Sequence, residues 1–270
     1  MIDISLRPAV ASAKRAVRLA GAYPVLKAAE SEAELQRVHA GYYFAFPLSL
    51  MTRPLASLPR LLGGPSRFRH RTQRPTTLYL PGLEAKPWWP ADDLAKTLEA
   101  NWECVAEEFA RIQHEVARHP QSYLVTSGDW SIFTLFQGFA KVERNCALCP
   151  RTTEIVESLP LCTNVAGLVY FSIMKPGTVV KPHFGPVNTR LRYHLTLHDD
   201  PGAEIRVGGE RRSWKAGQCL VFDDSFEHEV AHHGSSPRVV LLLDCWHPSL
   251  TAQERDFLDR LYRCLAGIKA

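Results

Sequence analysis

The stretch that decides the fold is residues 182–197, which read Pro-His-Phe-Gly-Pro-Val-Asn-Thr-Arg-Leu-Arg-Tyr-His-Leu-Thr-Leu. In its second half, Arg190, Arg192 and His194 alternate with apolar residues, a pattern that predicts a β-strand. Successive side chains of a strand point to opposite faces, so the three polar side chains share one face. A face with two guanidinium groups and an imidazole is too polar for a packed core. It is therefore either exposed to solvent or part of a ligand pocket that binds anions.

Further strands are predicted on both sides of this stretch. Short β-type runs are separated by turns such as Pro176-Gly177, Pro201-Gly202 and Ala216-Gly217. The runs are Leu168–Met174, Leu191–Leu197, Ala203–Val207, Cys219–Phe222 and Arg238–Cys245. Short strands with regular turns are typical of a double-stranded β-helix, the jelly-roll or cupin-like architecture. The expected fold class is therefore α+β with a mainly β core.

Helical patterns flank this core in the sequence. One amphipathic helix is predicted from Pro90 to about Arg118, and a capped helix over Thr251–Leu265. Residues 6–38 also carry apolar residues at helical spacing, and the stretch after Met51 is dense in Pro, Gly and Arg, as in a linker. We predict two parts: a basic helical extension with its linker, residues 1–74, and a β-helix domain flanked by helices, residues 75–270.

The composition excludes several classes of protein. With 46% hydrophobic and 22% charged residues, the chain is neither collagen-like nor wholly disordered. No apolar run reaches the roughly 20 residues of a membrane-spanning helix, and the N-terminus lacks the order of a secretory signal. Seven cysteines, an odd number, argue against a disulfide scaffold and favour the cytoplasm. Nucleic-acid-binding and phosphate-cradling motifs are absent, so no nucleic-acid partner is expected.

Charge is distributed unevenly along the chain. The formal net charge is +4, but residues 1–74 hold 12 basic and 4 acidic side chains, a net of +8, and residues 75–270 carry a net of −4. Three roles of the basic part remain open: a solvated extension, recruitment of a partner or substrate, and contact with an anionic membrane surface. Membrane contact would use Arg60, Arg67, Arg69, Arg71 and Arg74 beside Leu61, Leu62 and Phe68. The expected location is cytoplasmic, with peripheral membrane contact as the alternative.

Histidines gather in the β-rich part of the chain, where 7 of the 11 lie between residues 183 and 247. His183 follows a strand and a turn at Pro182, and His228 lies 45 residues later, just beyond another strand. Two imidazoles on separate strands of a small barrel suit a transition metal such as iron, copper or zinc. Each histidine also fits a capping or packing role. Their place in one barrel beside several arginines favours the metal site.

Several motifs occur in a fixed order along this part of the chain. They are Tyr-Phe-Ser-Ile-Met-Lys-Pro-Gly-Thr (170–178), the stretch 182–195, Arg-Val-Gly-Gly-Glu (206–210), Phe-Asp-Asp-Ser-Phe-Glu-His-Glu-Val (222–230) and Arg-Val-Val-Leu-Leu-Leu-Asp-Cys-Trp-His-Pro (238–248). Together they resemble the aspartyl/asparaginyl β-hydroxylase family of iron(II)- and 2-oxoglutarate-dependent dioxygenases. The resemblance covers about Pro75 to Arg255, so residues 75–270 are expected to be such a dioxygenase domain. It implies Fe(II) as cofactor, with 2-oxoglutarate and O2 as cosubstrates.

The resemblance implies that His183 and His228 are the two iron ligands. Most oxygenases of this class add an Asp or Glu two residues after the first His. This chain has Gly185 there, which cannot ligate. The resemblance implies that water takes the vacant position, whereas the residues alone fit a halide or a lost metal equally well. Asp223 and Asp224, shortly before the second histidine, are candidates for a substitute ligand.

The resemblance also implies which residues bind the cosubstrate and the substrate. Arg192 and His194 would contact the C1 carboxylate side of 2-oxoglutarate. Ser172 and Arg238 would hold its C5 carboxylate, and a guanidinium suits such a bidentate pair. Arg190 is similar to the arginine that meets an acidic group of the substrate.

The cysteines offer a second candidate metal site. Cys146 and Cys149 have the spacing of metal ligands, and Cys162 follows 13 residues later. A structural zinc site needs four ligands, and no second pair follows at the usual interval. Buried thiols are the favoured interpretation, and a zinc or redox site is the alternative.

The expected function is that of an iron(II)- and 2-oxoglutarate-dependent hydroxylase that β-hydroxylates aspartyl or asparaginyl residues of a peptide or protein. Relatives in the same family hydroxylate free amino acids or the acyl chains of lipid A, and the metal-site residues do not separate these substrates. Arg190 favours a substrate with an anionic group. From a different class, a non-catalytic cupin-like binding module remains as an alternative, and its mark would be an intact fold that binds no iron.

Overall fold

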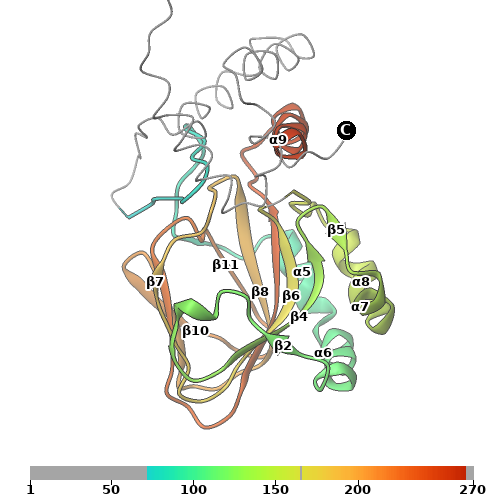
Figure 1. The fold of residues 1–270 in the computed structure, drawn as a ribbon, viewed down its shortest axis with the longest axis vertical. Coiled ribbons are helices and arrows are strands. Elements are labelled where there is room, and N and C mark those ends of the chain that lie inside the picture. Colours follow the sequence, from blue (N-terminus) through green and yellow to red (C-terminus); the bar gives the residue numbers. More distant parts are fainter. Residues whose placement is uncertain (1–71, 165, 266–270) are drawn as a thin grey trace, which may run out of the picture.

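A computed structural model describes residues 72–164 and 166–265 of the chain. Within them, two β-sheets face each other and helices lie against the outer side of one sheet (Figure 1). The predicted helices of residues 6–38 and the arginines proposed for membrane contact up to Arg71 lie outside the described residues.

The two sheets are antiparallel throughout the described residues. The strands are β1 (Trp88–Trp89), β2 (Ala117–Arg118), β3 (Val125–Ser127), β4 (Trp130–Gln137), β5 (Ala140–Lys141), β6 (Leu168–Met174), β7 (Val179–His183), β8 (Arg190–His198), β9 (Ala203–Val207), β10 (Glu210–Ser213), β11 (Cys219–Phe222), β12 (His228–His232) and β13 (Arg238–Trp246). The eight-stranded sheet has the order β1-β11-β8-β13-β6-β4-β2, with β5 paired to β4. The five-stranded sheet has the order β10-β9-β12-β7-β3.

From β6 to β13 the chain follows the path of a double-stranded β-helix. Strands β11, β8, β13 and β6 are neighbours in the large sheet, and β10, β9, β12 and β7 are neighbours in the same relative order in the small sheet. Each turn of the chain thus supplies strands to both sheets. The strand order confirms the predicted fold class.

Five α-helices complete the described part: α5 (Asp93–Ala100), α6 (Trp102–Ile112), α7 (Glu143–Leu148), α8 (Pro150–Glu157) and α9 (Ala252–Leu265). The prediction of one long helix from Pro90 to Arg118 is wrong. The chain breaks at Asn101, whose side chain donates to the carbonyl of Thr97 (2.8 Å) and so ends α5. The predicted cap of α9 is confirmed, because Glu254 N donates to Thr251 Oγ1 (3.2 Å). Within the described residues, every helix is too short or too polar to cross a membrane.

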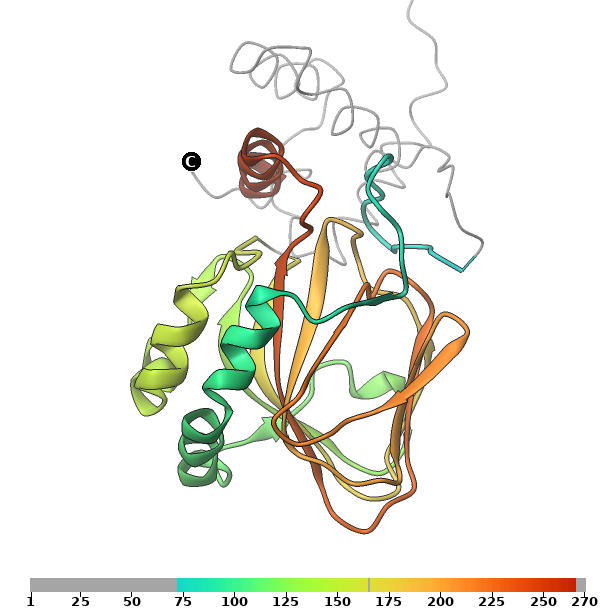
Figure 2. The same cartoon turned by 180° about the vertical axis from the view of Figure 1, so that it is seen from behind.

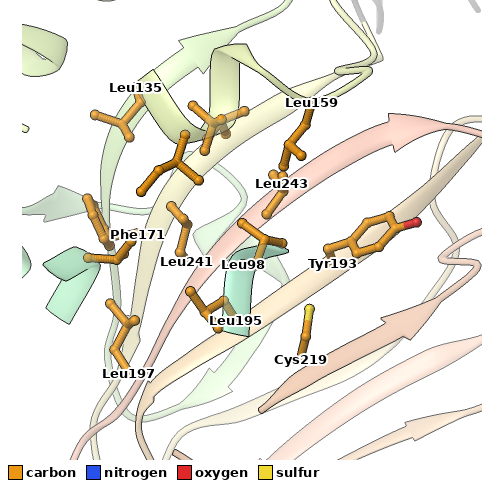
Figure 3. Packing of buried hydrophobic residues seen from close by; sticks show 14 of the residues in the cluster. Leu98, Leu135, Leu159, Phe171, Tyr193, Leu195, Leu197, Cys219, Leu241 and Leu243 are labelled. Carbon is orange, nitrogen blue, oxygen red and sulfur yellow. The ribbon is translucent and has the colours of Figure 1, made fainter. Parts of the chain in front are cut away.

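One hydrophobic core lies between the large sheet and the helices α5 to α8 (Figure 2). Leu98 of α5 and Leu135 of β4 belong to it, together with Leu195 of β8 and Leu241 of β13 (Figure 3). A second core fills part of the space between the two sheets. The first covers the outer face of the large sheet, so the opposite face is available for a site inside the barrel.

The first described residues run along two loops of the barrel. Arg74 N donates to the carbonyl of Ser225 (2.9 Å), and Thr76 N donates to that of Gly185 (3.0 Å). The side chain of Gln73 donates to Asp223 Oδ2 (2.9 Å) and to Ser225 Oγ (3.1 Å). Residues 72–74, which were assigned to the linker from the sequence, therefore contact the β-rich domain.

Candidate active site

Strand β8 separates the outer core from the interior of the barrel. Leu191, Tyr193 and Leu195 belong to the core between the large sheet and the helices, and Figure 3 shows Tyr193 and Leu195 there. By the alternation of a strand, Arg190, Arg192 and His194 point into the space between the sheets. Arg190 is 1% exposed and His194 6%, so the face is not a solvated surface. The solvent-exposed alternative is excluded, and a ligand pocket on this face stays a prediction.

His183 and His228 meet on the small sheet. They are cross-strand partners of β7 and β12, and their ring centroids are 4.0 Å apart. Each Nδ1 lies 2.9 Å from a carbonyl two residues earlier, that of Lys181 or Phe226. A carbonyl only accepts, so Nδ1 carries the proton and the Nε2 lone pair stays free.

Both imidazoles are held in the neutral form that a metal needs. Burial lowers the pKa of His183, and burial together with the charge of His183 lowers the pKa of His228 to about 3. Metal-bound histidines usually donate their other ring N–H to a carbonyl or carboxylate, which fixes the tautomer. Two adjacent neutral imidazoles with free Nε2 atoms fit a divalent transition metal.

The space beside Gly185 is filled by Asp224. A Cβ built on Gly185 would lie 2.4 Å from Asp224 Cγ, so no side chain fits there while Asp224 keeps its place. Among the described residues, no third His, Cys, Asp or Glu joins the two histidines in a metal-binding group. The carboxylate of Asp224 is bound instead by two arginines, which leaves the substitute-ligand role without support.

Asp224 and Asp244 compensate the charges of Arg190 and Arg192. Arg190 Nη2 lies 2.7 Å from Asp224 Oδ2, and its Nη1 donates to Asp244. Arg192 binds Asp244 through Nε (2.9 Å) and Nη2 (3.1 Å), and reaches Asp224 through Nη1 (3.1 Å). Burial raises the pKa of Asp224, but Arg190 and Arg192 outweigh it and hold that pKa well below its usual value. We call these four residues the charge tetrad.

The tetrad changes what is expected of Arg190. The sequence predicts that it meets an acidic group of the substrate. Both terminal nitrogens of Arg190 are already bound by the carboxylates of Asp224 and Asp244, and the residue is 1% exposed. Its Nε has no hydrogen-bond partner, but the two carboxylates already compensate its charge.

Arg238 has no such partner. It is 1% exposed and donates from Nη1 to Ser172 Oγ (3.3 Å), while its Nε has no hydrogen-bond partner. Its guanidinium lies over the Trp214 ring, 4.6 Å from the centroid, and burial lowers its pKa to about 9. Within the described residues no carboxylate pairs with it. A buried cation without a counter-charge is costly, so this position fits a bound anion.

His194 adds a neutral donor to the interior. Its Nδ1 accepts from Trp214 Nε1 (3.2 Å), so the ring proton is on Nε2, which has no partner. Burial, then the charges of Arg238 and Arg192, lower its pKa well below the usual value. Nε2 of His194 and Nε of Arg238 both lack a partner, and both residues contact Trp214, so an anion would satisfy these two donors.

The sequence did not reveal several residues of this site. Asp244 stands alone in the apolar run of β13, directly opposite Arg192 on β8. A buried charge in such a run needs a partner, and this signal could have identified it. Trp130 donates from Nε1 to Ser172 Oγ (3.0 Å), and Trp214 binds both Arg238 and His194. The sequence carries no pattern that distinguishes these tryptophans from core residues.

Among the described residues, the three cysteines of the second candidate site do not join the two histidines in a metal-binding group. Cys146 and Cys149 are buried in the outer core, and Cys162 is 3% exposed. Burial raises the pKa of Cys149 and of Cys162 to about 12, which keeps both thiols protonated. No metal-binding group of cysteines forms among the described residues. These facts favour buried thiols over a zinc site.

Comparison with known proteins shows a matching family and relatives of this chain. The model of the family described as Aspartyl/Asparaginyl beta-hydroxylase matches residues 99–248, more than half of the chain. Aspartate beta-hydroxylase domain-containing protein 2 of Rattus norvegicus is 39% identical over 70% of this chain and 59% of its own length. Aspartyl/asparaginyl beta-hydroxylase of Homo sapiens is 41% identical over 67% of this chain and 25% of its own length. The chain therefore spans less than two thirds of these relatives.

Among solved structures, a cupin-like protein from Thermotoga maritima superposes with a TM-score of 0.31 and 12% identity, over 52% of this chain and 90% of that chain. The fold assignment rests on the strand order of the two sheets and not on this superposition.

Proposed function

Because the chain belongs to the aspartyl/asparaginyl β-hydroxylase family, we propose that it is an iron(II)- and 2-oxoglutarate-dependent hydroxylase of Asp or Asn residues in a peptide or protein. One observation carries the proposal. Two neutral histidines with free Nε2 atoms share a barrel with a buried guanidinium that has no counter-charge. This is the donor set that a divalent metal and a dicarboxylate need together.

His183 and His228 would hold Fe(II) through Nε2, with their rings fixed by the carbonyls behind them. Iron with 2-oxoglutarate and O2 supplies the oxidising power that converts a C–H bond to C–OH, while 2-oxoglutarate becomes succinate and CO2. Gly185 contributes no ligand, so a third protein ligand is not expected, and water rather than a halide suits a hydroxylase.

Arg238 and Ser172 would bind the C5 carboxylate of 2-oxoglutarate. Arg238 has an unpaired Nε, and Ser172 Oγ is held by the indole N–H of Trp130. His194 would donate from Nε2 toward the C1 end, together with the remaining N–H groups of Arg192. The charge tetrad fixes the orientation of Arg192, so this donor is in place before the cosubstrate binds.

The family supports the proposed substrate class. An Asp or Asn side chain of a peptide is the proposed substrate, and a free amino acid or a lipid acyl chain is the alternative. Since Asp224 and Asp244 compensate Arg190, the site does not depend on a second anion for charge balance. It therefore suits an amide as well as a carboxylate.

The test measures succinate formation and iron binding by the purified chain. With Fe(II), ascorbate, O2 and a panel of capped peptides that each contain one Asp or Asn, we expect 2-oxoglutarate to be consumed and a peptide to gain about 16 Da. His228→Ala should abolish both turnover and tight Fe(II) binding. His233→Ala, a change of an exposed histidine directly after β12, is the control.

Three outcomes decide the proposal. A wild-type protein that binds no Fe(II) would refute it, and full activity of His228→Ala would refute the ligand assignment. Consumption of 2-oxoglutarate with amino acids or lipid extracts, but with no peptide, would replace the substrate class and retain the chemistry.

A further inference from the structure

The segment between β2 and β3 crosses from one sheet to the other. Before the segment, β2 pairs with β4 at the edge of the large sheet, and after it, β3 pairs with β7 at the edge of the small sheet. Between them, the single helical turn Ser122–Leu124 contacts β7, the strand that ends in His183. The crossing segment therefore lies along the side of the barrel that carries the metal-binding histidines. The segment carries His119, which is buried with 5% of its surface exposed.

The ring of His119 packs against residues that adjoin the proposed cosubstrate site. It stacks on Trp130 with centroids 3.6 Å apart and planes 7° apart, and it meets Tyr170 edge-on at 5.7 Å. The indole N–H of Trp130 in turn holds Ser172. Only one aromatic ring therefore lies between His119 and the residues proposed to bind 2-oxoglutarate.

The tautomer of His119 is fixed by its own loop. The backbone N–H of Gln121 donates to Nδ1 (3.0 Å), so the proton of the neutral ring is on Nε2. Burial, then the charges of Arg192 and His183, lower the pKa of His119 to about 3, which keeps the ring neutral. Among the described residues, Nε2 has no hydrogen-bond partner. His119 thus presents a neutral N–H donor at the side of the active site.

We propose that His119 binds the substrate, its Nε2–H donating to a carbonyl or carboxylate oxygen of the substrate residue beside His183. A neutral donor serves the oxygen of an Asp and of an Asn side chain alike, in agreement with the compensated charges of Arg190 and Arg192. The inference rests on the proposed function, because it takes an Asp or Asn peptide as the occupant.

Two substitutions separate this role from a purely structural one. His119→Phe keeps the stack on Trp130 and removes the donor, whereas His119→Gln keeps an N–H donor and loses the aromatic stack. The control is His114→Phe, because the side chain of His114 is 72% exposed. Binding of the capped Asp and Asn peptides is measured without O2, by quenching of tryptophan fluorescence in protein loaded with Mn(II) and 2-oxoglutarate.

We expect His119→Phe to weaken peptide binding about tenfold, the effect of one lost hydrogen bond. His119→Gln should stay within about threefold of the wild type, and the affinity for 2-oxoglutarate should not change in any variant. A structural role predicts the reverse order, with Phe like the wild type and Gln impaired, and that result overturns the inference. A wild type that binds none of the peptides overturns it as well. A wild type that binds peptides without forming succinate from 2-oxoglutarate refutes the proposed function alone, because the binding comparison still tests His119.

Discussion

Removing the charge of Asp244 should destabilise the protein strongly, even though Asp244 lies far from the surface and contacts no proposed substrate. Its carboxylate accepts from Arg190, from Arg192 at 2.9 Å and 3.1 Å, and from the backbone N–H of Leu168 at 3.1 Å. Asp244→Asn keeps the volume and one acceptor oxygen. It leaves two buried guanidinium groups to share the single charge of Asp224.

The expected loss follows from the burial of the partners. Arg190 is 1% exposed and Asp244 also 1%, so solvent screens the pair little. Removing one partner of a buried ion pair typically destabilises a protein by about 3–5 kcal/mol. For a domain of this size that corresponds to a melting temperature lower by roughly 6–20 °C.

Urea unfolding of the metal-free protein, followed by far-ultraviolet circular dichroism, measures the effect. The control is Asp259→Asn, which breaks the more exposed pair with Arg263 and should change the free energy of unfolding by less than about 1 kcal/mol. Arg192→Met in the Asp244→Asn background removes the unbalanced charge and should recover about 1–3 kcal/mol. A loss below about 1 kcal/mol for Asp244→Asn, or no recovery in the double variant, would refute the charge-balance reasoning.

Two further outcomes follow from the buried charges. Arg238→Met should raise the KM for 2-oxoglutarate by at least about 50-fold. It should leave the metal-free protein as stable as the wild type or more stable, because a buried charge without a counter-charge is removed. Titration with 2-oxoglutarate and thermal melts measure the two effects, and an unchanged KM contradicts the assignment of Arg238. Burial raises the pKa of Asp223 to about 7, so the folded protein retains a proton that the unfolded carboxyl releases near pH 4. This contribution to stability is complete below about pH 4 and is lost as the pH rises through 7, at about 1.4 kcal/mol per pH unit. In Asp223→Asn, Gln73 can still bind the new side chain by turning its amide. The variant should lose this pH-dependent part of the free energy of unfolding, measured with urea between pH 4 and 8. Identical pH profiles of variant and wild type would contradict the raised pKa of Asp223.

Local sequence patterns were sufficient to predict the strands that lie between clear turn residues. The predicted bounds of β6, β9 and β11 agree with the structure, because apolar runs between turn residues specify both strand and register. Strands β7 and β12 escaped prediction. Strand β7 ends with His183 and contains Lys and Pro, and strand β12 begins with His228 and contains Glu. Part of each strand belongs to the site and not to a core, so neither has a regular apolar pattern.

The candidate site was predictable only where its residues share one strand. Arg190, Arg192 and His194 follow from the period of two along β8. The charge balance does not, because the contact between Asp244 and Arg192 depends on the pairing of β13 with β8. The stack of His119 on Trp130 likewise joins a crossing segment to a strand, and no spacing along the sequence encodes such a contact.

The two faces of β8 limit how this protein can change by insertion and deletion. One face packs against the helices, and the other supplies Arg190, Arg192 and His194 to the interior. Adding or removing a single residue inside the strand would move every later side chain to the opposite face. A leucine (after a deletion) or a tyrosine (after an insertion) would then replace the imidazole in the barrel, and an arginine would enter the outer core. Length variation among homologous chains should therefore fall in the turns beyond Arg190 and His198, while the strand itself changes only by substitution.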